Sequence, residues 1–429
     1  MKPLPFARSA KAARKTRLNL MPDWAEVKLE KRALLAVVTW DGGAGTMNWG
    51  DAANWDGDNL PTSTDDVVIP DLAGVQTINV NITTGNAKTL NSVENVTIQA
   101  SQSLTLRDGT SQVSGVFTVS PGGTLVAESG SVFTPTGAVT IDGADLYARD
   151  SGTSGNGGKL NLAAATSYVN SNRWRGRIEA TGGNSLIDLS GLSSVKNGGV
   201  SGTPMAGLDI TVSAGGKIDL KNVTQISAGA GGGQSIWMTA SDNSTSWGWY
   251  PEGTSRIFVN SGATIISPEL KTLSTVEIYH NGGSMDVSRI ESMTGGGIIV
   301  NAGTVNYTSL VRINSADITN NGGTIGLSTV SNFDSTSLWV GGGRTIDLSQ
   351  VTSYKNPSRW RATFQATQPG SQINLSGLQE IINGGVSGTP MAGLDITVSA
   401  GGKIDLKNVT QISAGAGGGQ SIWMTASDN

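Results

Sequence analysis

Cysteine is absent from this chain of 429 residues, and histidine occurs once. The lack of cysteine excludes a disulfide framework, a thiolate metal site and a thiol nucleophile. The single histidine, His280, excludes multi-histidine metal sites, and its place before Asn281 and two glycines predicts a surface or turn residue rather than a general base. No stretch reaches the roughly 18 apolar residues of a membrane-spanning helix, so the sequence predicts no transmembrane helix.

Charged residues are few, at 14%, and they are unevenly placed along the chain. Residues 1–36 hold nine Lys or Arg against three acidic residues, whereas the rest of the chain holds 20 basic and 30 acidic residues. An acidic body does not suit nucleic-acid binding, because nucleic-acid-binding proteins present basic surface to phosphate. The basic head and the apolar run 33–38 after it are typical of a targeting segment, with a solvated basic tail as the alternative.

A short motif overlaps the end of the basic head. It reads Leu29-Glu30-Lys31-Arg32-Ala33-Leu34-Leu35-Ala36. This segment resembles the L-E-P-R-x-L-L-[SA] motif near the N-terminus of planctomycete exported and surface proteins, with Lys31 in place of the usual proline. The resemblance implies export, and we assign residues 1–39 as a basic export or targeting segment that is disordered.

A stretch rich in Trp, Asn and Asp follows, and we assign residues 40–71 as an N-terminal cap. It contains Trp40, Trp49 and Trp55, then a Gly-Asp-x-x-Pro sequence and an Asp-x-Val-x-Ile sequence. This pattern resembles the segment that leads into repetitive β-regions of bacterial surface proteins. We expect the three tryptophans to pack over the first repeat unit, with a ligand platform as the alternative.

Internal duplication is the strongest pattern in residues 72–429. Residues 197–243 and 383–429 are identical over 47 positions, at an offset of 186. The match continues upstream, so copy one covers about 155–340 and a truncated copy two covers about 341–429. Because repeat arrays normally end in an atypical capping repeat, we interpret the chain as a fragment of a longer array.

A shorter period of about 20 residues lies inside the long repeat. Apolar residues recur at this interval, and each is followed two positions later by a second residue of the same series: Ile265, Met285, Val305 and Ile325, then Ser267, Val287, Tyr307 and Leu327. Alternation with period two, broken by turns rich in Gly and Asn, predicts stacked coils of short strands.

The sequence therefore predicts an all-β protein, a right-handed parallel β-helix (β-solenoid) with about 20-residue rungs. A leucine-rich-repeat-like solenoid shares this period and is the alternative. The double and triple glycines, and the absence of fixed Leu/Asn spacing, favour the β-helix.

Stacked rungs also align one outward position in each unit. The aligned residues are Asp286, Asn306, Gly326 and Asp347, with Asn161, Asp188, Asp219, Asn374 and Asp405 in the other units. Asn and Gly between the aspartates reduce the like-charge repulsion across neighbouring strands. We interpret this column as a solvated face, with a row of calcium or sugar ligands as the alternative.

Two aromatic segments depart from the rung pattern and supply the candidate ligand-binding residues. Flat aromatic faces suit sugar rings, so surface glycans or other surface proteins are the expected partners. Packing against the solenoid wall is the alternative for both segments. The candidates are Trp247, Trp249 and Tyr250, together with Arg173, Trp174 and Arg175 and their copies Arg359, Trp360 and Arg361.

The cap is acidic, and oxygen ligands at this density suit calcium. Asp56 and Asp58 are the weak candidate ligands, although their surroundings do not fit an EF-hand loop. We assign no catalytic residue and expect no other cofactor.

These features together favour a non-catalytic, exported or cell-surface solenoid with a structural or adhesin-like role. One alternative is a polysaccharide lyase or glycoside hydrolase of the pectin-lyase-like β-helix type, because such sites assemble across rungs and leave no linear motif. A carbohydrate-binding module that uses the aromatic segments is the other.

Overall fold

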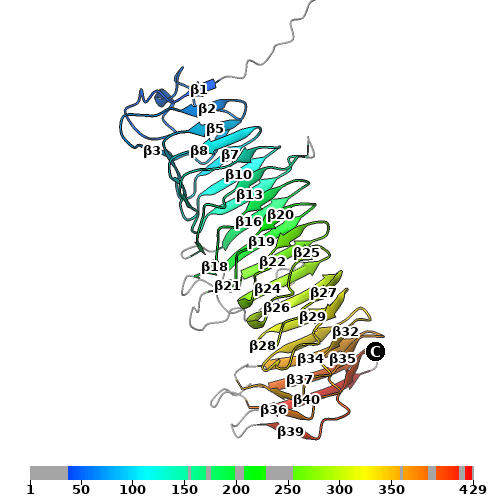
Figure 1. The fold of residues 1–429 in the computed structure, drawn as a ribbon. Coiled ribbons are helices and arrows are strands. Elements are labelled where there is room, and N and C mark those ends of the chain that lie inside the picture. Colours follow the sequence, from blue (N-terminus) through cyan, green and yellow to red (C-terminus); the bar gives the residue numbers. More distant parts are fainter. Residues whose placement is uncertain are drawn as a thin grey trace, which may run out of the picture. The chain divides into compact units, whose positions relative to one another are not determined.

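A computed structural model describes residues 37–152, 156–170, 175–198, 207–228, 255–357, 361–384, 393–414 and 421–427. These residues are all-β, with a single 3₁₀ turn, η2 (Ala52–Asn54), as their helical content. The named strands pair in parallel and follow one another in chain order (Figure 1), which confirms the predicted parallel β-solenoid. Within the described ranges, no helix is long and apolar enough to cross a membrane.

Each coil contributes one strand to each of three faces, which we name sheets a, b and c in chain order. This arrangement does not fit the leucine-rich-repeat alternative. Sheet a contains β1 (Val37–Thr39), β2 (Asp66–Ile69), β5 (Thr89–Ser92), β8 (Thr110–Val113), β11 (Val132–Phe133), β14 (Lys159–Asn161), β17 (Leu186–Asp188), β20 (Lys217–Asp219), β23 (Thr264–Ile266), β25 (Ser284–Met285), β27 (Thr304–Asn306), β30 (Thr324–Gly326), β32 (Thr345–Asp347), β35 (Gln372–Asn374) and β38 (Lys403–Asp405).

The other two sheets share two long strands, β24 (Thr272–Asn281) and β26 (Ser292–Ala302), which contribute their first part to sheet b and their second part to sheet c. Sheet b also contains β3 (Thr77–Val80), β6 (Asn95–Ile98), β9 (Phe117–Val119), β12 (Val139–Thr140), β15 (Tyr168–Asn170), β18 (Ser194–Asn197), β21 (Gln225–Ala228), β28 (Arg312–Asn314), β33 (Ser353–Lys355), β36 (Glu380–Asn383) and β39 (Gln411–Ala414).

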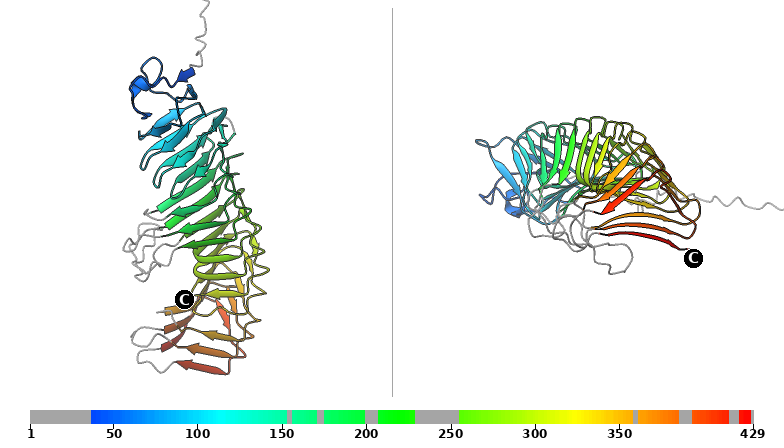
Figure 2. Two further views of the ribbon diagram at one scale, coloured as in Figure 1. Left: turned by 60° about the vertical axis from the view of Figure 1, so that its left-hand side comes forward. Right: turned by 90° about the horizontal axis from the view of Figure 1, so that it is seen from below.

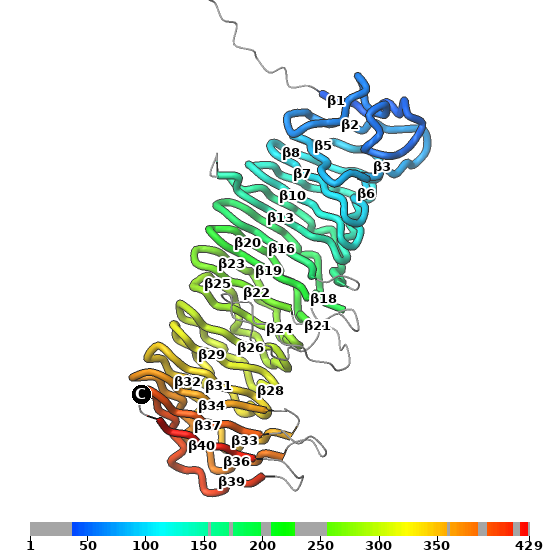
Figure 3. Tube along the Cα trace, turned by 180° about the vertical axis from the view of Figure 1, so that it is seen from behind, coloured from blue at the N-terminus to red at the C-terminus, as the bar shows by residue number. Residues whose placement is uncertain are grey.

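Sheet c is the most continuous face, and its strands lie next to one another in Figures 2 and 3. It contains β4 (Gly85–Ala87), β7 (Ser103–Leu106), β10 (Thr124–Glu128), β13 (Asp145–Arg149), β16 (Arg175–Thr181), β19 (Gly207–Ser213), β22 (Ser255–Asn260), β29 (Asp317–Asn320), β31 (Ser337–Val340), β34 (Arg361–Thr367), β37 (Gly393–Ser399) and β40 (Ser421–Ser427).

The core is the inside of the coils, and the predicted alternation fills it. In β30 and the turn after it, Ile325 and Leu327 are 7% and 2% exposed, while Gly326 between them faces outward. Most strands show the same alternation of buried and accessible residues, as a period of two requires. Burial of these inward side chains against the coils above and below is the main stabilising contribution.

Strand register gives the length of each coil. Leu160 pairs with Ile187, Ile187 with Ile218, and Ile218 with Ile265, in steps of 27, 31 and 47 residues. Ile265 then pairs with Met285 in a step of 20. The 20-residue rung therefore describes the coils that follow β23, whereas the 47 residues after Ile218, more than two rungs by the short period, form one coil.

The extra residues of the long coils lie at the corner between sheets b and c. The chain between β21 and β22, for example, spans residues 229–254. In the 20-residue coils, β24 and β26 pass through this corner as single strands, bent at Thr275 (φ 54°) and Gly296 (φ 69°). A Cβ atom at Gly296 would lie 2.1 Å from the carbonyl oxygen of Val276, so the tight corner requires glycine there.

Buried asparagines fix the same corner where coils are long. The Nδ2 of Asn170 donates to Oδ1 of Asn197 at 2.8 Å and to the carbonyl oxygen of Gly207 at 3.0 Å. In the second copy, Asn356 Nδ2 donates to Asn383 Oδ1 at 2.9 Å. All four asparagines are fully buried, and their bonds join the end of sheet b to sheet c of the next coil.

The first coil carries the tryptophan cluster. Trp40, Trp49 and Trp55 are at most 2% exposed, and Trp55 packs edge-on against both others, with ring centroids 4.9 and 4.7 Å away. The predicted packing of the three tryptophans is confirmed. In contrast, Val37–Thr39 were expected to be part of a disordered segment, and they form β1, paired with β2.

The 186-residue duplication is also a structural repeat. Ile346 pairs with Ile373 and Ile373 with Ile404, in the same steps of 27 and 31 residues that separate Leu160, Ile187 and Ile218. The two copies therefore place their long coils and their corners in the same order.

Candidate functional site

The outer face of sheet c brings together charged and aromatic side chains from coils that are distant in sequence. Register aligns two rows across β16, β19, β22, β24, β26, β29 and β31, which are adjacent in Figure 1. The charged column is Arg177, Asp209, Arg256, Glu277, Gly297 and Asp317. The aromatic column is Phe258, Tyr279, Ile299, Thr319 and Trp339. Members of a row are about 4.8 Å apart, so an extended ligand could contact several coils.

Asp209 is the centre of the ion pairs on this face. Arg256 donates to it with two groups, from Nε and from Nη2, each at 2.8 Å, and Arg175 Nη1 donates to Oδ1. Bonding to Asp209 raises the pKa of Arg256. Burial lowers the pKa of the Arg175 guanidinium, and the Asp209 carboxylate opposes that shift. The carboxylate thus holds two arginines from different coils in fixed positions.

Glu277 is the next acidic residue of the charged column. Its Oε2 accepts a hydrogen bond from the Tyr279 hydroxyl at 2.9 Å. Burial raises the pKa of the Glu277 carboxyl, and the nearby Asp317 carboxylate adds to that shift, while the Tyr279 bond and Arg256 oppose it. Gly297 follows Glu277 in the row and leaves the outer surface without a side chain at that point.

The aromatic column offers flat apolar surface beside these charges. Phe258 and Tyr279 are stacked, with ring centroids 4.7 Å apart and 23° between the planes. The Arg256 guanidinium lies 5.2 Å from the Phe258 centroid, and Trp339 further along the row is 37% exposed. A row of rings beside hydrogen-bonding charged groups is the arrangement on which sugar rings stack.

Two of the sequence-predicted ligand residues belong to this face. Arg175 begins β16 and bonds Asp209; Arg361 begins β34 and bonds Asp395, with Nη2 2.8 Å from Oδ1. Both side chains are therefore held by ion pairs. The other candidates lie outside the described residues: Trp247, Trp249, Tyr250, Arg173, Trp174, Arg359 and Trp360.

The candidate calcium ligands serve local backbone geometry. Asp56 Oδ1 accepts the backbone N–H of Thr39 at 2.9 Å, and Asp58 has a φ of 55° in the turn after Trp55. Among the residues described, no three of His, Cys, Asp or Glu are grouped so that they could hold a metal ion.

The outward Asp/Asn column aligns as predicted. Asn161 pairs with Asp188, Asp188 with Asp219, and Asp347 with Asn374 and thence Asp405. Most of its members accept the N–H of the residue two positions later, for example Ser190 to Asp188 at 2.9 Å and Ser349 to Asp347 at 3.0 Å. Such Asx turns start the corner after sheet a, and this role favours a structural face over a row of ligands.

His280 is not the surface or turn residue that the sequence predicts. It lies in β24, 4% exposed, with Nε2 2.8 Å from the hydroxyl oxygen of Tyr307. Burial lowers its pKa to about 4, so the imidazole is neutral near pH 7. Its contact is with the interior of the solenoid, away from sheet c's outer face.

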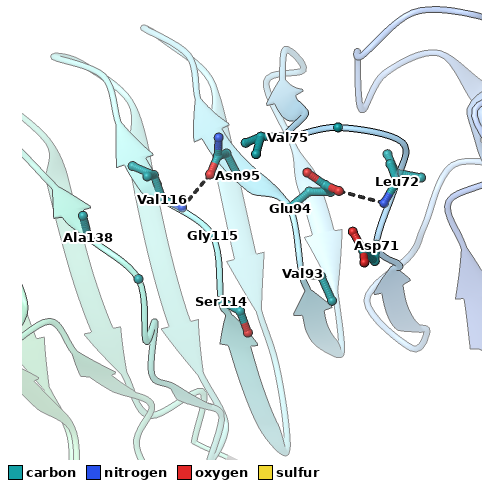
Figure 4. Close-up of a pocket in the computed structure, with 12 residues that line it drawn as sticks. Asp71, Leu72, Val75, Val93, Glu94, Asn95, Ser114, Gly115, Val116 and Ala138 are labelled. Atoms are coloured by element: carbon teal, nitrogen blue, oxygen red, sulfur yellow. Dashed lines mark hydrogen bonds between the residues drawn. The ribbon is translucent and has the colours of Figure 1, made fainter.

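An open hollow lies at the corner between sheets a and b near the N-terminus (Figure 4). Its carboxylate, Glu94, is 4% exposed and accepts the N–H groups of Leu72 and Gln76 at 2.8 and 2.7 Å. Asn95 accepts the N–H of Val116 at 2.7 Å. These polar groups hold adjacent coils together, and the rest of the hollow is largely valine and glycine, so it is not the better candidate site.

The two columns of sheet c were missed from sequence, although a signal was present. Glu277, Gly297 and Asp317 are 20 residues apart, as are Tyr279, Ile299, Thr319 and Trp339. Extending the 20-residue period to outward positions finds both rows from β24 onward. The steps to Arg256 and Asp209 cross a long coil and need the register of the structure.

No protein-family model, curated protein or solved structure matches the chain. Function is therefore inferred from the arrangement of the side chains.

Proposed function

We propose that this chain is a non-catalytic, exported surface protein whose solenoid presents sheet c to extracellular glycans or to other surface proteins, in a structural and adhesin-like role. One observation carries the proposal: the same corner is built twice. Arg175 bonds Asp209 in the first copy, and Arg361 bonds Asp395 at the same positions 186 residues later. Repeated display of one weak contact raises avidity without any new contact.

Export rests on the N-terminal sequence. The basic head of residues 1–36 and the Leu29–Ala36 segment, which resembles the motif of planctomycete exported proteins, support a location outside the cell. Antibodies against the purified chain test it on cells of the source organism. Labelling of intact cells is the expected result, and labelling only after permeabilisation would refute the location.

Glycan binding rests on the aromatic column. Phe258 and Tyr279 form a stacked pair, and Trp339 exposes its ring on the same face. The test is titration of the full chain against soluble polysaccharides, repeated with Phe258→Ala and Trp339→Ala. We expect about tenfold weaker binding in each, because loss of one ring contact removes about 1 kcal/mol or more.

A matched control is Val116→Ala, which shortens another exposed apolar side chain at a different corner. It should bind as the unmodified chain does. If the aromatic variants also bind unchanged, the glycan site is elsewhere; if the unmodified chain binds no glycan, surface proteins become the expected partners.

A polysaccharide lyase or glycoside hydrolase is the second candidate, and Glu277 is the observation that favours it. Its raised pKa suits a general acid. Asp317 lies two strand steps away, about 10 Å along the row, near the carboxylate separation of inverting glycosidases. Release of reducing ends or unsaturated uronates by the chain, abolished in Glu277→Gln, would establish the enzyme; absence of product across polysaccharide classes would leave the binding role.

A further inference from the structure

The last described coils present a surface whose sequence occurs twice in the chain. Residues 393–414, which contain β37, β38 and β39, are identical to residues 207–228, which contain β19, β20 and β21. In the first copy this surface is covered. The segment Ser255–Ser274 lies on it, because β22 pairs with β19, β23 with β20 and the start of β24 with β21.

Burial differs sharply between the two identical surfaces. Ile226 is fully buried in the first copy, whereas its equivalent, Ile412, is 48% exposed. The same holds for three further inward residues, which are fully buried in the first copy and only partly buried in the second: Ile218, Leu220 and Val223 against Ile404, Leu406 and Val409. The second surface thus has the apolar side chains of a coil interior without the coil that buries them.

A different strand occupies one edge of the second surface. β40 (Ser421–Ser427) pairs with β37, and its identical sequence in the first copy, 235–241, lies outside the described residues. The strand that pairs with β19 there is β22. β40 places Trp423 opposite Asp395, at the position where Arg256 bonds Asp209. Trp423 and Met424 remain 62% and 54% exposed.

We propose that the face formed by β37, β38 and β39 is a docking surface for an extended segment with the sequence of Ser255–Ser274, and that this segment displaces β40. The chemistry required of the partner follows from the first copy. It carries inward apolar residues, Ile257, Ile265 and Leu273 among them, and a cation at Arg256 for Asp395. The solenoid thereby adds a coil on the template of the coil before it.

The exchange is favourable because the segment makes more contacts than β40 does. β40 provides one strand pairing, with β37, whereas Ser255–Ser274 provides three in the first copy. It also covers the apolar residues that β40 leaves exposed. Arg256 adds a two-point bond to an aspartate, which Trp423 cannot make.

The test uses a fluorescein-labelled synthetic peptide of Ser255–Ser274 and the full chain. We expect saturable binding by fluorescence anisotropy. In hydrogen exchange, amides of residues 403–414 should become slower and those of residues 421–427 faster. A scrambled peptide of the same composition is the control and should not bind. Absence of binding up to the solubility limit, or unchanged exchange in β40, would overturn the proposal.

Charge reversal tests the register of docking. A peptide with Arg256→Glu should bind about tenfold more weakly, and a chain with Asp395→Arg should restore its binding. Met424→Pro in the chain removes a backbone donor from β40 and should strengthen binding of the unmodified peptide. Met424 is exposed, so this change leaves the inner coils intact. Equal binding of the Arg256→Glu peptide to both chains would show that the peptide does not pair beside β37.

Discussion

The Nε2 atom of His280 lies 2.8 Å from the hydroxyl oxygen of Tyr307, inside the solenoid. Burial lowers the pKa of His280 to about 4 and raises the pKa of Tyr307. Both groups are therefore neutral in the folded chain near pH 7. A protonated imidazole would place a charge among the inward side chains, where it lacks solvation.

This contact predicts acid sensitivity. Between the ordinary histidine pKa of 6.5 and the folded value of about 4, the unfolded chain binds more protons at His280 than the folded chain does. The free energy of unfolding should therefore be unaffected by His280 above pH 6.5 and should fall by about 3 kcal/mol as the pH drops through that window.

Urea unfolding at about pH 7 and about pH 4.5 measures the loss. His280→Gln is the control, because glutamine offers hydrogen-bonding groups to Tyr307 and does not titrate. The variant should lose less stability on acidification than the unmodified chain. An equal loss in both proteins would assign the acid sensitivity to carboxylates.

A matched pair of substitutions tests the inward–outward alternation. Ile325→Asp should destabilise the fold by several kcal/mol, because it buries an unpaired charge between coils. Gly326→Asn should cost less than about 1 kcal/mol. Its Cβ would lie 2.4 Å from Asn306 Oδ1, which is the end of a side chain that can move. Thermal unfolding measures both, and similar effects would mean that the assigned register is wrong.

The buried asparagines predict a second stability difference. Asn197→Ala removes the acceptor for Asn170 Nδ2 inside the b–c corner and should cost about 1–3 kcal/mol. Asn222→Ala is the control, since Asn222 is exposed and makes one bond, to the carbonyl oxygen of Ser190 at 2.7 Å. Chemical denaturation should separate the two variants; indistinguishable midpoints would count against a role for the asparagine pair in holding the corner.

The two sets of aromatic candidates can be compared directly. Trp247→Ala and Trp249→Ala test the segment that the sequence favours, and Phe258→Ala tests the column that the structure shows. We expect the largest loss of glycan affinity in Phe258→Ala, because its ring is stacked within a row. Isothermal titration against the polysaccharide that binds best decides between them. If only the tryptophan variants lose affinity, the long coil carries the site.

The fold was largely predictable because inward positions repeat in sequence. Ile265, Met285, Val305 and Ile325 occupy equivalent places, and the structure buries each of them. Coil length was less predictable. An insertion at a corner leaves no periodic pattern, so sequence alone did not show that Ile218 pairs with Ile265 across 47 residues.

The same reasoning explains the wrong prediction for His280. Its neighbours in sequence suggest a turn, yet register aligns it with Val259 and Val300, two buried residues. At the candidate site, Arg175 was found from its unusual neighbours. Asp209 and Arg256 were not, because they are 34 and 47 residues away along the sequence and come together only through strand register.

The duplicated corner also acts as a molecular ruler. Seven coils separate β14 from its copy β32, which at about 4.8 Å per coil sets equivalent side chains about 34 Å apart along the stack. A polymer long and stiff enough to span that interval engages two corners at once, whereas a short oligomer engages one. The protein should therefore discriminate ligands by chain length as well as by the chemistry of a single sugar.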